Sequence, residues 1–232
     1  MPFNFHDSKI YEIDYKVFFN ELYSKFCGNL FSDEEKTKSY INTYLRYMKK
    51  ADKKFNDFIS NRDNFFALVD QLDNTQIFQQ PIEYDNSVIH LHFLVGKLIE
   101  SVPDWKNNSN DAPLVFFQGQ KAKYFWTPTQ SDITLSSDPI IAAPFPFEFS
   151  DYLIIDGNHR LTSWEKEKRS IPVTHVSGNY LIRMELFASE FDSLYYIFHC
   201  DTTNLANLKH YYNFSDDDLL KQTFLNTGKL PF

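Results

Sequence analysis

The residues best suited to chemistry stand together in LIIDGNHRLTSW, which spans residues 153–164. Asp156 is a carboxylate that could orient a metal ion, accept a proton or bond a ribose hydroxyl. Gly157 permits a tight turn and lets a ligand approach the backbone closely. His159 offers a donor or a proton relay near neutral pH, and Arg160 can hold a phosphate or carboxylate with two hydrogen bonds. These types suit the binding and reaction of an anion.

The flanking residues predict how this group is positioned. Residues 153–155 are apolar and of strand length, and residues 160–170 have the spacing of a short helix with Leu161 and Trp164 facing inward. A strand that leads through a glycine into a helix directs backbone N–H groups and the positive helix end at one point, which favours an anion. A purely structural turn, with Arg160 paired to a neighbouring carboxylate, is the alternative.

Other apolar runs predict a sheet around this turn. PIIAAPF, YLIID and IPVTHV read as strands, and PLVFFQG with KAKYFWTP forms a hairpin candidate. A β–turn–α–β unit is therefore expected over about residues 151–176. Lys121 and Lys123 beside Tyr124 and Trp126 suit base stacking, although an exposed lysine face on a hairpin is the commoner meaning.

The N-terminal part has the periodicity of helices from about residue 11 to residue 73. Ser32 and Glu35 form a capping-box pattern for the second helix. A third helix is expected over residues 53–72, with Phe58 and Phe66 among its inward candidates.

A break in this pattern suggests where one domain ends and another begins. Pro81 indicates a linker, which divides the chain into a helical region over residues 1–80 and an α+β domain over residues 81–232. Residues 87–102 again read as a helix. Two C-terminal helices are expected, the second capped by Ser215.

Residues 152–176, YLIIDGNHRLTSWEKEKRSIPVTHV, resemble the signature region of the ParB/sulfiredoxin-like superfamily. In that region an apolar strand leads to a D-G-x-x-R or G-x-x-R turn, then a helix, then a strand written IPV. The resemblance extends from residue 139 to residue 176. It implies an α+β fold, namely a small mixed sheet with packed helices, here accompanied by the N-terminal helical region.

The resemblance also implies roles for residues of the turn. It makes Gly157, Asn158, His159 and Arg160 the phosphate-contacting turn. Asp156 matches the residue that supports metal and phosphoryl transfer in the free-serine kinase branch, whose turn reads D-G-H-T-R. Asn158 occupies the slot of the sulfiredoxin cysteine, so cysteine-based reduction is not expected. The G-E-R-R turn of ParB is not matched either, which weakens CTP-dependent DNA clamping.

Together these observations predict a protein that binds a nucleotide or another phosphorylated small molecule. As an enzyme it would be a nucleotide-dependent phosphotransferase or a nucleotide hydrolase, with Mg²⁺ and ATP or CTP as cofactors. Asp156 and His159 would be catalytic, and Asp156 would be the metal ligand. Glu148 and Asp151, which are near in sequence, are candidates for the second acidic residue of the site. The alternatives are a non-catalytic protein-interaction module, which binds a protein or a second copy through its helices, and a DNA-associated ParB-like factor or nuclease.

Composition narrows these possibilities. The chain has 232 residues, of which 43% are hydrophobic and 18% aromatic, so it can bury a core. Its formal charge of -8 disfavours a nucleic-acid partner, although a local basic site stays open. No secretion signal or membrane-spanning run is visible, which predicts a cytoplasmic protein without a membrane partner. Cys27 and Cys200 suggest neither zinc nor a disulfide, and His90 with His92 suit satisfied histidines better than metal ligands.

Overall fold

The computed structural model describes residues 3–5, 7, 9–73, 75–84, 87–107, 123–129, 139–147, 150–167 and 173–230. The chain forms two compact units, Met1–Leu94 with Phe187–Pro231, and Val95–Leu186. Helices and small sheets occur in both, so the architecture is α+β. This grouping places residues 81–94 and 187–231 with the N-terminal helices, whereas the sequence predicted a single division between residues 80 and 81.

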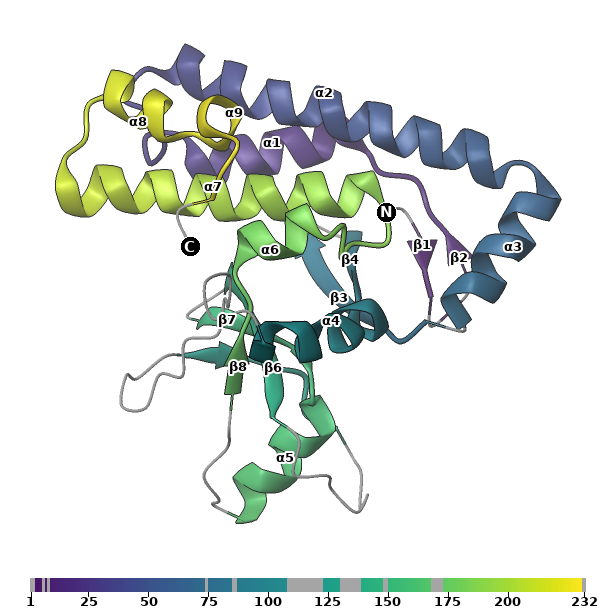
Figure 1. Ribbon diagram of the computed structural model, residues 1–232. Helices are drawn as coiled ribbons and strands as arrows, with labels where there is room; N and C mark the ends of the chain where they lie inside the picture. Colours follow the sequence, from purple (N-terminus) through teal and green to yellow (C-terminus); the bar gives the residue numbers. More distant parts are fainter. Residues whose placement is uncertain are drawn as a thin grey trace. The chain divides into compact units, whose positions relative to one another are not determined.

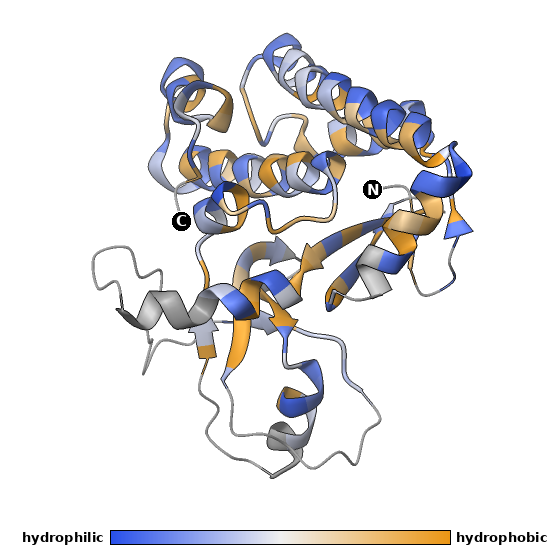
Figure 2. Cartoon of the chain, turned by 45° about the vertical axis from the view of Figure 1, so that its right-hand side comes forward, coloured by the Kyte–Doolittle hydropathy of each residue, from blue (hydrophilic) through white to orange (hydrophobic). Residues whose placement is uncertain are grey.

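Three helices form the body of the first unit: α1 (Tyr15–Phe26), α2 (Glu34–Ile59) and α7 (Glu190–Tyr212). Figure 1 shows them side by side, and Figure 2 shows hydrophilic residues predominating along α2 with hydrophobic ones between them. Their facing sides are apolar and aromatic. Buried residues there include Phe18, Leu22, Phe26, Tyr44, Tyr196 and Phe198.

The start of α2 differs from its predicted cap by one residue. Asp33, and not Ser32, is the N-cap, and its side chain accepts hydrogen bonds from the amides of Glu35 and Lys36. The amide of Ser32 instead donates to the carboxylate of Asp216 at 2.8 Å. A carboxylate at the N-cap satisfies the first helix amides as well as a hydroxyl does.

The predicted third helix is divided between α2 and α3 (Arg62–Asp73), because the helix breaks at Ser60 and Asn61. Two of its predicted inward residues face water, since Phe58 is 46% exposed and Phe66 is 54% exposed. Because the helix is interrupted, residues before and after the break do not share one helical face. A periodicity counted across the break therefore predicts the wrong buried residues.

The predicted linker and part of the next predicted helix form a β-hairpin. Strand β3 (Ile77–Tyr84) pairs antiparallel with β4 (Ser87–Leu94), and Pro81 lies opposite His90. A two-stranded sheet has only edge strands, which tolerate proline. A short apolar run such as β4 cannot be told from a helix by periodicity alone, and pairing decides.

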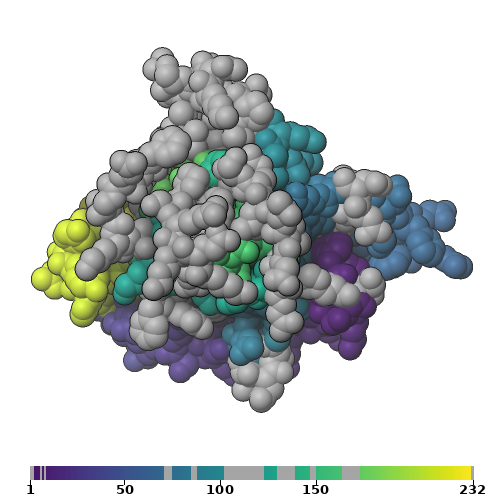
Figure 3. All heavy atoms as spheres, turned by 90° about the horizontal axis from the view of Figure 1, so that it is seen from below, coloured from purple at the N-terminus to yellow at the C-terminus, as the bar shows by residue number. Residues whose placement is uncertain are grey.

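The remaining elements of the first unit are short. Strands β1 (Phe3–Asn4) and β2 (Lys9–Ile10) pair with each other. The predicted last helix is divided into α8 (Asp216–Gln222) and α9 (Phe224–Thr227), and Ser215 caps α8 as expected. In Figure 3 the yellow C-terminal end of this unit adjoins purple atoms of its N-terminal part. Lys209 Nζ donates to the carbonyl of Gly28 at 3.0 Å across that junction.

A four-stranded mixed sheet forms the centre of the second unit, in the order β5-β7-β6-β8. Strands β6 (Ile140–Phe147) and β7 (Ser150–Asp156) are antiparallel. Strand β5 (Tyr124–Phe125) runs parallel to β7, and β8 (Val173–His175) runs parallel to β6. The predicted small mixed sheet is thus present. The first arm of the predicted hairpin, PLVFFQG, lies outside the described residues.

Helix α5 (Asn158–Glu167) connects β7 to β8, which confirms the predicted β–turn–α–β unit. Leu161 packs with Ile140, Ala142 and Ile154 of the sheet. Burial of these side chains fixes the start of α5 against β6 and β7. The unit also contains α4 (Val95–Asn107) and α6 (Gly178–Arg183).

Candidate functional site

The candidate site is the turn between β7 and α5, where the sequence predicted a glycine-dependent bend. Gly157 has a φ of +93°, a backbone conformation that side chains resist. A Cβ at this position would also lie 2.5 Å from Ile140 Cγ2 and 3.0 Å from an Arg160 terminal nitrogen. Glycine is therefore required both by the backbone angle and by the close packing.

Asp156 and Arg160 lie on either side of this glycine and form an ion pair. A terminal nitrogen of Arg160 donates to Asp156 Oδ2 at 2.5 Å, and the two side chains are 14% and 13% exposed. The pair spans the first turn of α5. Because a guanidinium is always charged, the pair holds a partly desolvated cation next to the helix N-terminus.

Asn158 is occupied by contacts within the protein. Its Oδ1 accepts a hydrogen bond from the amide of Thr127 at 3.1 Å, and its Nδ2 donates to the carbonyl of Ile154 at 3.3 Å. The side chain thus fastens residues 123–129 to the turn. The backbone amide of Asn158 and the second hydrogen on its Nδ2 are the donors that these two bonds do not use. His159 is exposed on the first turn of α5.

Thr162 extends this fastening along α5. Its hydroxyl donates to the carbonyl of Asn158 at 2.8 Å and accepts from the amide of Thr129 at 3.2 Å. Hydroxyl bonding at the helix start was anticipated for Thr162 from its position. The hydrogen bond from the Thr129 amide to the Thr162 hydroxyl was not predicted, because the two residues are 33 positions apart.

The segment fastened to α5 carries two buried polar atoms, Trp126 Nε1 and Thr129 Oγ1, that have no hydrogen-bond partner among the described residues. Trp126 packs against the cluster that includes Leu161 of α5. Buried polar groups are nearly always paired, so these two atoms are candidates for contact with a bound group. Sequence reasoning considered Trp126 for base stacking and did not consider Thr129.

An aromatic group lies across the strands of the same sheet. Tyr124 Oη is 2.9 Å from His175 Nε2, and the two rings are stacked with centroids 5.7 Å apart. The Tyr152 ring lies 4.6 Å from that of His175. Burial raises the pKa of both tyrosines above the ordinary value. His175, which the sequence left between pocket and core, is buried within this group.

The described residues include no group of three or more histidine, cysteine, aspartate or glutamate side chains that could hold a metal. Asp156 is paired with Arg160, and the Asp151 carboxylate accepts the amide of Lys123 at 3.2 Å. Glu148 lies outside the described residues.

The histidine pair of the first unit is part of a strand, and His92 is internally satisfied. His92 Nδ1 lies 3.2 Å from Asp192 Oδ1, and Nε2 lies 3.1 Å from Gln79 Oε1. Burial lowers the pKa of His92, against the opposing attraction of Asp192. This confirms the interpretation of His92 as a satisfied core histidine. Cys27 and Cys200 are both free thiols.

Comparison with protein-family models, curated proteins and solved structures finds no match to this chain. Within the described part of the chain, no helix is both long enough and apolar enough to cross a membrane.

Proposed function

We propose that the second unit binds a phosphorylated small molecule, most simply a nucleotide such as ATP or CTP, at the turn formed by Asp156 to Arg160. The observation that carries the proposal is the Gly157 bend, whose φ of +93° places a helix N-terminus and an arginine directly after a buried strand. Helix N-termini and arginine are both preferred partners of phosphate.

The Asp156–Arg160 pair gives this site a particular electrostatic character. An incoming phosphate would compete for the guanidinium with the Asp156 carboxylate, whose oxygen lies 2.5 Å from a terminal nitrogen of Arg160. Since the arginine already lies in a partly desolvated position, little further side-chain ordering is needed when a phosphate replaces the carboxylate. Asp156 then acts as an internal anion that keeps Arg160 positioned.

Trp126 and Thr129 support the same proposal. Each has a buried polar side-chain atom without a partner in the described part of the chain, and both belong to the segment held against α5 by Asn158 and Thr162. A ligand beside α5 that offers acceptor oxygens would satisfy an indole N–H and a hydroxyl.

A reaction at this turn would require a side chain that carries a proton. The exposed His159 is the residue beside the turn best suited to carry a proton. Phosphoryl transfer or nucleotide hydrolysis with Mg²⁺ is the reaction that the family resemblance implies.

Calorimetric titration with ATP, CTP and GTP, each with and without Mg²⁺, tests the proposal. At least one nucleotide should bind the native chain. Arg160→Ala should weaken that binding about tenfold or more, which corresponds to losing a hydrogen bond to a charged group. The control is Arg183→Ala, an exposed arginine of the same unit, which should bind as the native chain does. Failure of all three nucleotides to bind would contradict the proposal.

Asp156→Asn separates the two roles considered for the carboxylate. If Asp156 only competes for Arg160, the neutral amide should tighten nucleotide binding severalfold in the absence of Mg²⁺. If Asp156 instead holds a metal, the variant should weaken binding when Mg²⁺ is present. Both results are compatible with a phosphate site, and they distinguish binding from metal-assisted chemistry.

A second candidate, the non-catalytic interaction module, is favoured by the same short ion pair. In that case Asp156 and Arg160 serve only to hold the start of α5, and no nucleotide binds. Arg160→Ala would then lower the melting temperature without altering any titration. A DNA-associated function would appear instead as salt-sensitive binding of a duplex probe.

A further inference from the structure

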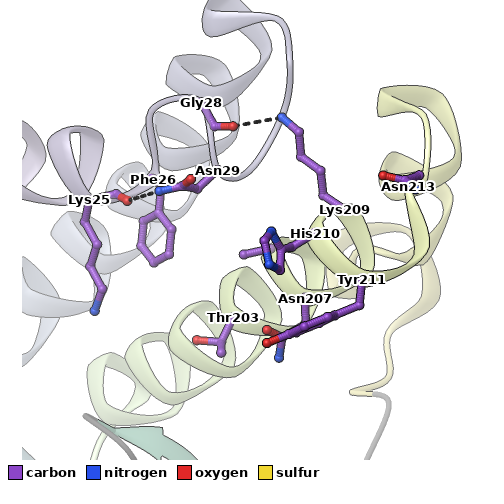
Figure 4. A pocket seen from close by; sticks show the side chains of 11 residues that line it. Lys25, Phe26, Gly28, Asn29, Thr203, Asn207, Lys209, His210, Tyr211 and Asn213 are labelled. Carbon is purple, nitrogen blue, oxygen red and sulfur yellow. Dashed lines mark hydrogen bonds between the residues drawn. The ribbon is translucent and has the colours of Figure 1, made fainter.

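A cavity that shares no residue with the turn lies entirely within the first unit. Its volume is about 520 Å³, within the range of roughly 300 to 1,000 Å³ typical of small-molecule sites. It lies where the C-terminal end of α1 faces that of α7 (Figure 4). The lining residues are Lys25, Phe26, Gly28, Asn29, Thr203, Ala206, Asn207, Lys209, His210, Tyr211 and Asn213.

The charge of this cavity is opposite to that of the chain. The lining includes Lys25, Lys209 and His210 and no carboxylate, whereas the whole chain has a formal charge of -8. Acidic residues outnumber basic ones by 31 to 23 along the chain, so a hollow with two lysines and no acidic side chain in its lining is a local exception. Such a hollow favours a negatively charged ligand.

The cations of the cavity have different roles. Lys209 holds the two helix ends together, because its ammonium group donates to the carbonyl of Gly28 at 3.0 Å. Lysines in last helical turns also complement the helix dipole, which is the structural explanation for their presence. Asn29 also has a structural role, because its Nδ2 donates to the carbonyl of Lys25 at 3.2 Å. The amide group of Asn207 adds a neutral hydrogen-bonding group to the wall.

Lys25 is the cation least compensated by its surroundings. Although part of its side chain is exposed, loss of hydration lowers the pKa of Lys25, and the attraction of Glu21 only partly opposes this. Its ammonium group lies 5.5 Å from the centre of the Phe26 ring. A bound anion would stabilise this charge, since an opposite charge favours the protonated form.

Flat side chains complete the wall. Figure 4 shows the rings of Phe26, from α1, and His210, from α7, directed toward the space between the two helices. Thr203, Asn207 and His210 follow one another at intervals of four and three residues, so they share one face of α7. Tyr211 lies at the rim and is 70% exposed.

We propose that this cavity binds a small organic anion that carries a planar ring. The carboxylate or phosphate group would lie near Lys25 and His210, and the ring would pack against Phe26 and Tyr211. The combination of a cation and aromatic faces selects for both parts of such a ligand. No lining residue belongs to the Asp156–Arg160 turn, so this proposal stands or falls independently of the proposed nucleotide site.

Titration of the ¹⁵N-labelled full chain with phenyl phosphate tests the inference. Amide resonances of Gly28, Asn29, Asn207 and His210 should shift in a saturable manner. Benzoate should shift the same amides, because it offers the same chemistry with a carboxylate. Inorganic phosphate, which lacks the ring, and benzyl alcohol, which lacks the charge, should each bind at least about fivefold more weakly, as expected when one modest contact is lost.

Charge reversal locates the site. Lys25→Glu should weaken phenyl phosphate binding by about tenfold, because it exchanges an attraction for a repulsion. Lys53→Glu is the matched control, since it changes the net charge equally on the exposed side of α2 and lies outside the cavity. His210→Ala is a second variant that leaves Lys209 and its bond to Gly28 in place.

Three results would overturn the proposal. The first is the absence of saturable shifts at these amides with phenyl phosphate and with benzoate. The second is equal binding of phenyl phosphate and inorganic phosphate, which would show that the ring of the ligand does not contribute to binding. The third is equal weakening by Lys25→Glu and Lys53→Glu, which would show that the anion responds to net charge alone.

Discussion

Two aspartates, one in each unit, show how the same carboxylate is used in opposite ways. Asp201 on α7 is buried, and its Oδ2 accepts hydrogen bonds from the hydroxyls of Tyr40 and Tyr44 and from the amide of Phe224. Asp156 on β7 is partly exposed and is paired with one guanidinium, that of Arg160. The first arrangement joins α2, α7 and the start of α9, whereas the second positions a cation.

The difference lies in the partners. Neutral donors do not offset the cost of burying a charge, so burial raises the pKa of Asp201, and the hydrogen bonds from Tyr40, Phe224 and Tyr44 only partly oppose it. The other oxygen, Oδ1, is buried without a hydrogen-bond partner among the described residues, so neutral donors hold this carboxylate through Oδ2 alone. A cation beside a helix N-terminus is different, because a ligand anion can take the place of its carboxylate partner. Burial and partner type together separate a structural carboxylate from a site carboxylate.

The largest effect is expected when Asp201 is replaced. Asp201→Ala leaves two tyrosine hydroxyls and one amide without their acceptor, which should lower the free energy of unfolding by about 3 kcal/mol or more. Urea denaturation measures the loss. Asp57→Ala, on the exposed side of α2, is the control and should change stability little. Equal stability of the two variants would remove the structural role assigned to Asp201.

A smaller but still large effect is expected at the turn. Gly157→Ala combines an unfavourable φ with a 2.5 Å contact to Ile140, so it should destabilise the chain by about 2 to 4 kcal/mol. Gly28→Ala has a similar φ of +74° and no atom within 4 Å of the added Cβ. It should cost only about 1 to 2 kcal/mol. If thermal denaturation finds both substitutions equally damaging, close packing at Gly157 is not important.

The next test concerns pH and His92. Because burial lowers the pKa of His92, the unfolded chain binds a proton at this residue before the folded chain does. Stability should therefore fall as the pH decreases below about 6.5, the ordinary histidine value, with a slope of at most about 1.4 kcal/mol per pH unit from this group. Urea denaturation between pH 7.5 and pH 5 should show a shallower slope for His92→Gln. An unchanged slope would assign the effect to other groups.

The smallest effect is expected where residues 123–129 are fastened to α5. Thr162→Val keeps the shape of the side chain but removes the acceptor for the amide of Thr129, at a cost of about 1 kcal/mol. Hydrogen exchange at Thr129 should accelerate accordingly. The neighbouring Ser163→Ala offers a comparison on the same helix. Equal exchange rates in the two variants would show that Thr162 does not hold this segment.

The local features that were predicted correctly depend on neighbouring residues. The Gly157 turn, helix α5 and strands β6 to β8 follow from an apolar run, a glycine and an amphipathic segment placed in order. The N-cap at Ser215 was correct for the same reason, because a cap interacts with residues two or three positions away. Pairing of Asp156 with Arg160 was likewise a foreseeable alternative, since the residues are four positions apart.

The features that were missed depend on distant residues. Strand β4 was taken for a helix because its pairing with β3 is not encoded in its own periodicity. The bonds from the amides of Ser32 and Asp33 to Asp216, over 180 positions away, were not predicted either. A role for Thr129 at the candidate site was not predicted, because its hydrogen-bond partner Thr162 lies on another element. Contacts of this kind carry no local signal in a single sequence.

The bond between Tyr40 and Asp201 has a consequence for biosynthesis, because its two residues are 161 positions apart. A ribosome releases α1 and α2 long before α7, and every residue of Val95–Leu186 emerges in between. The unit Val95–Leu186 is contiguous and can fold before α7 is synthesised. Until then α1 and α2 lack part of the core that they share with α7. Nascent chains arrested before residue 190 should accordingly expose the aromatic faces of α1 and α2 to chaperones.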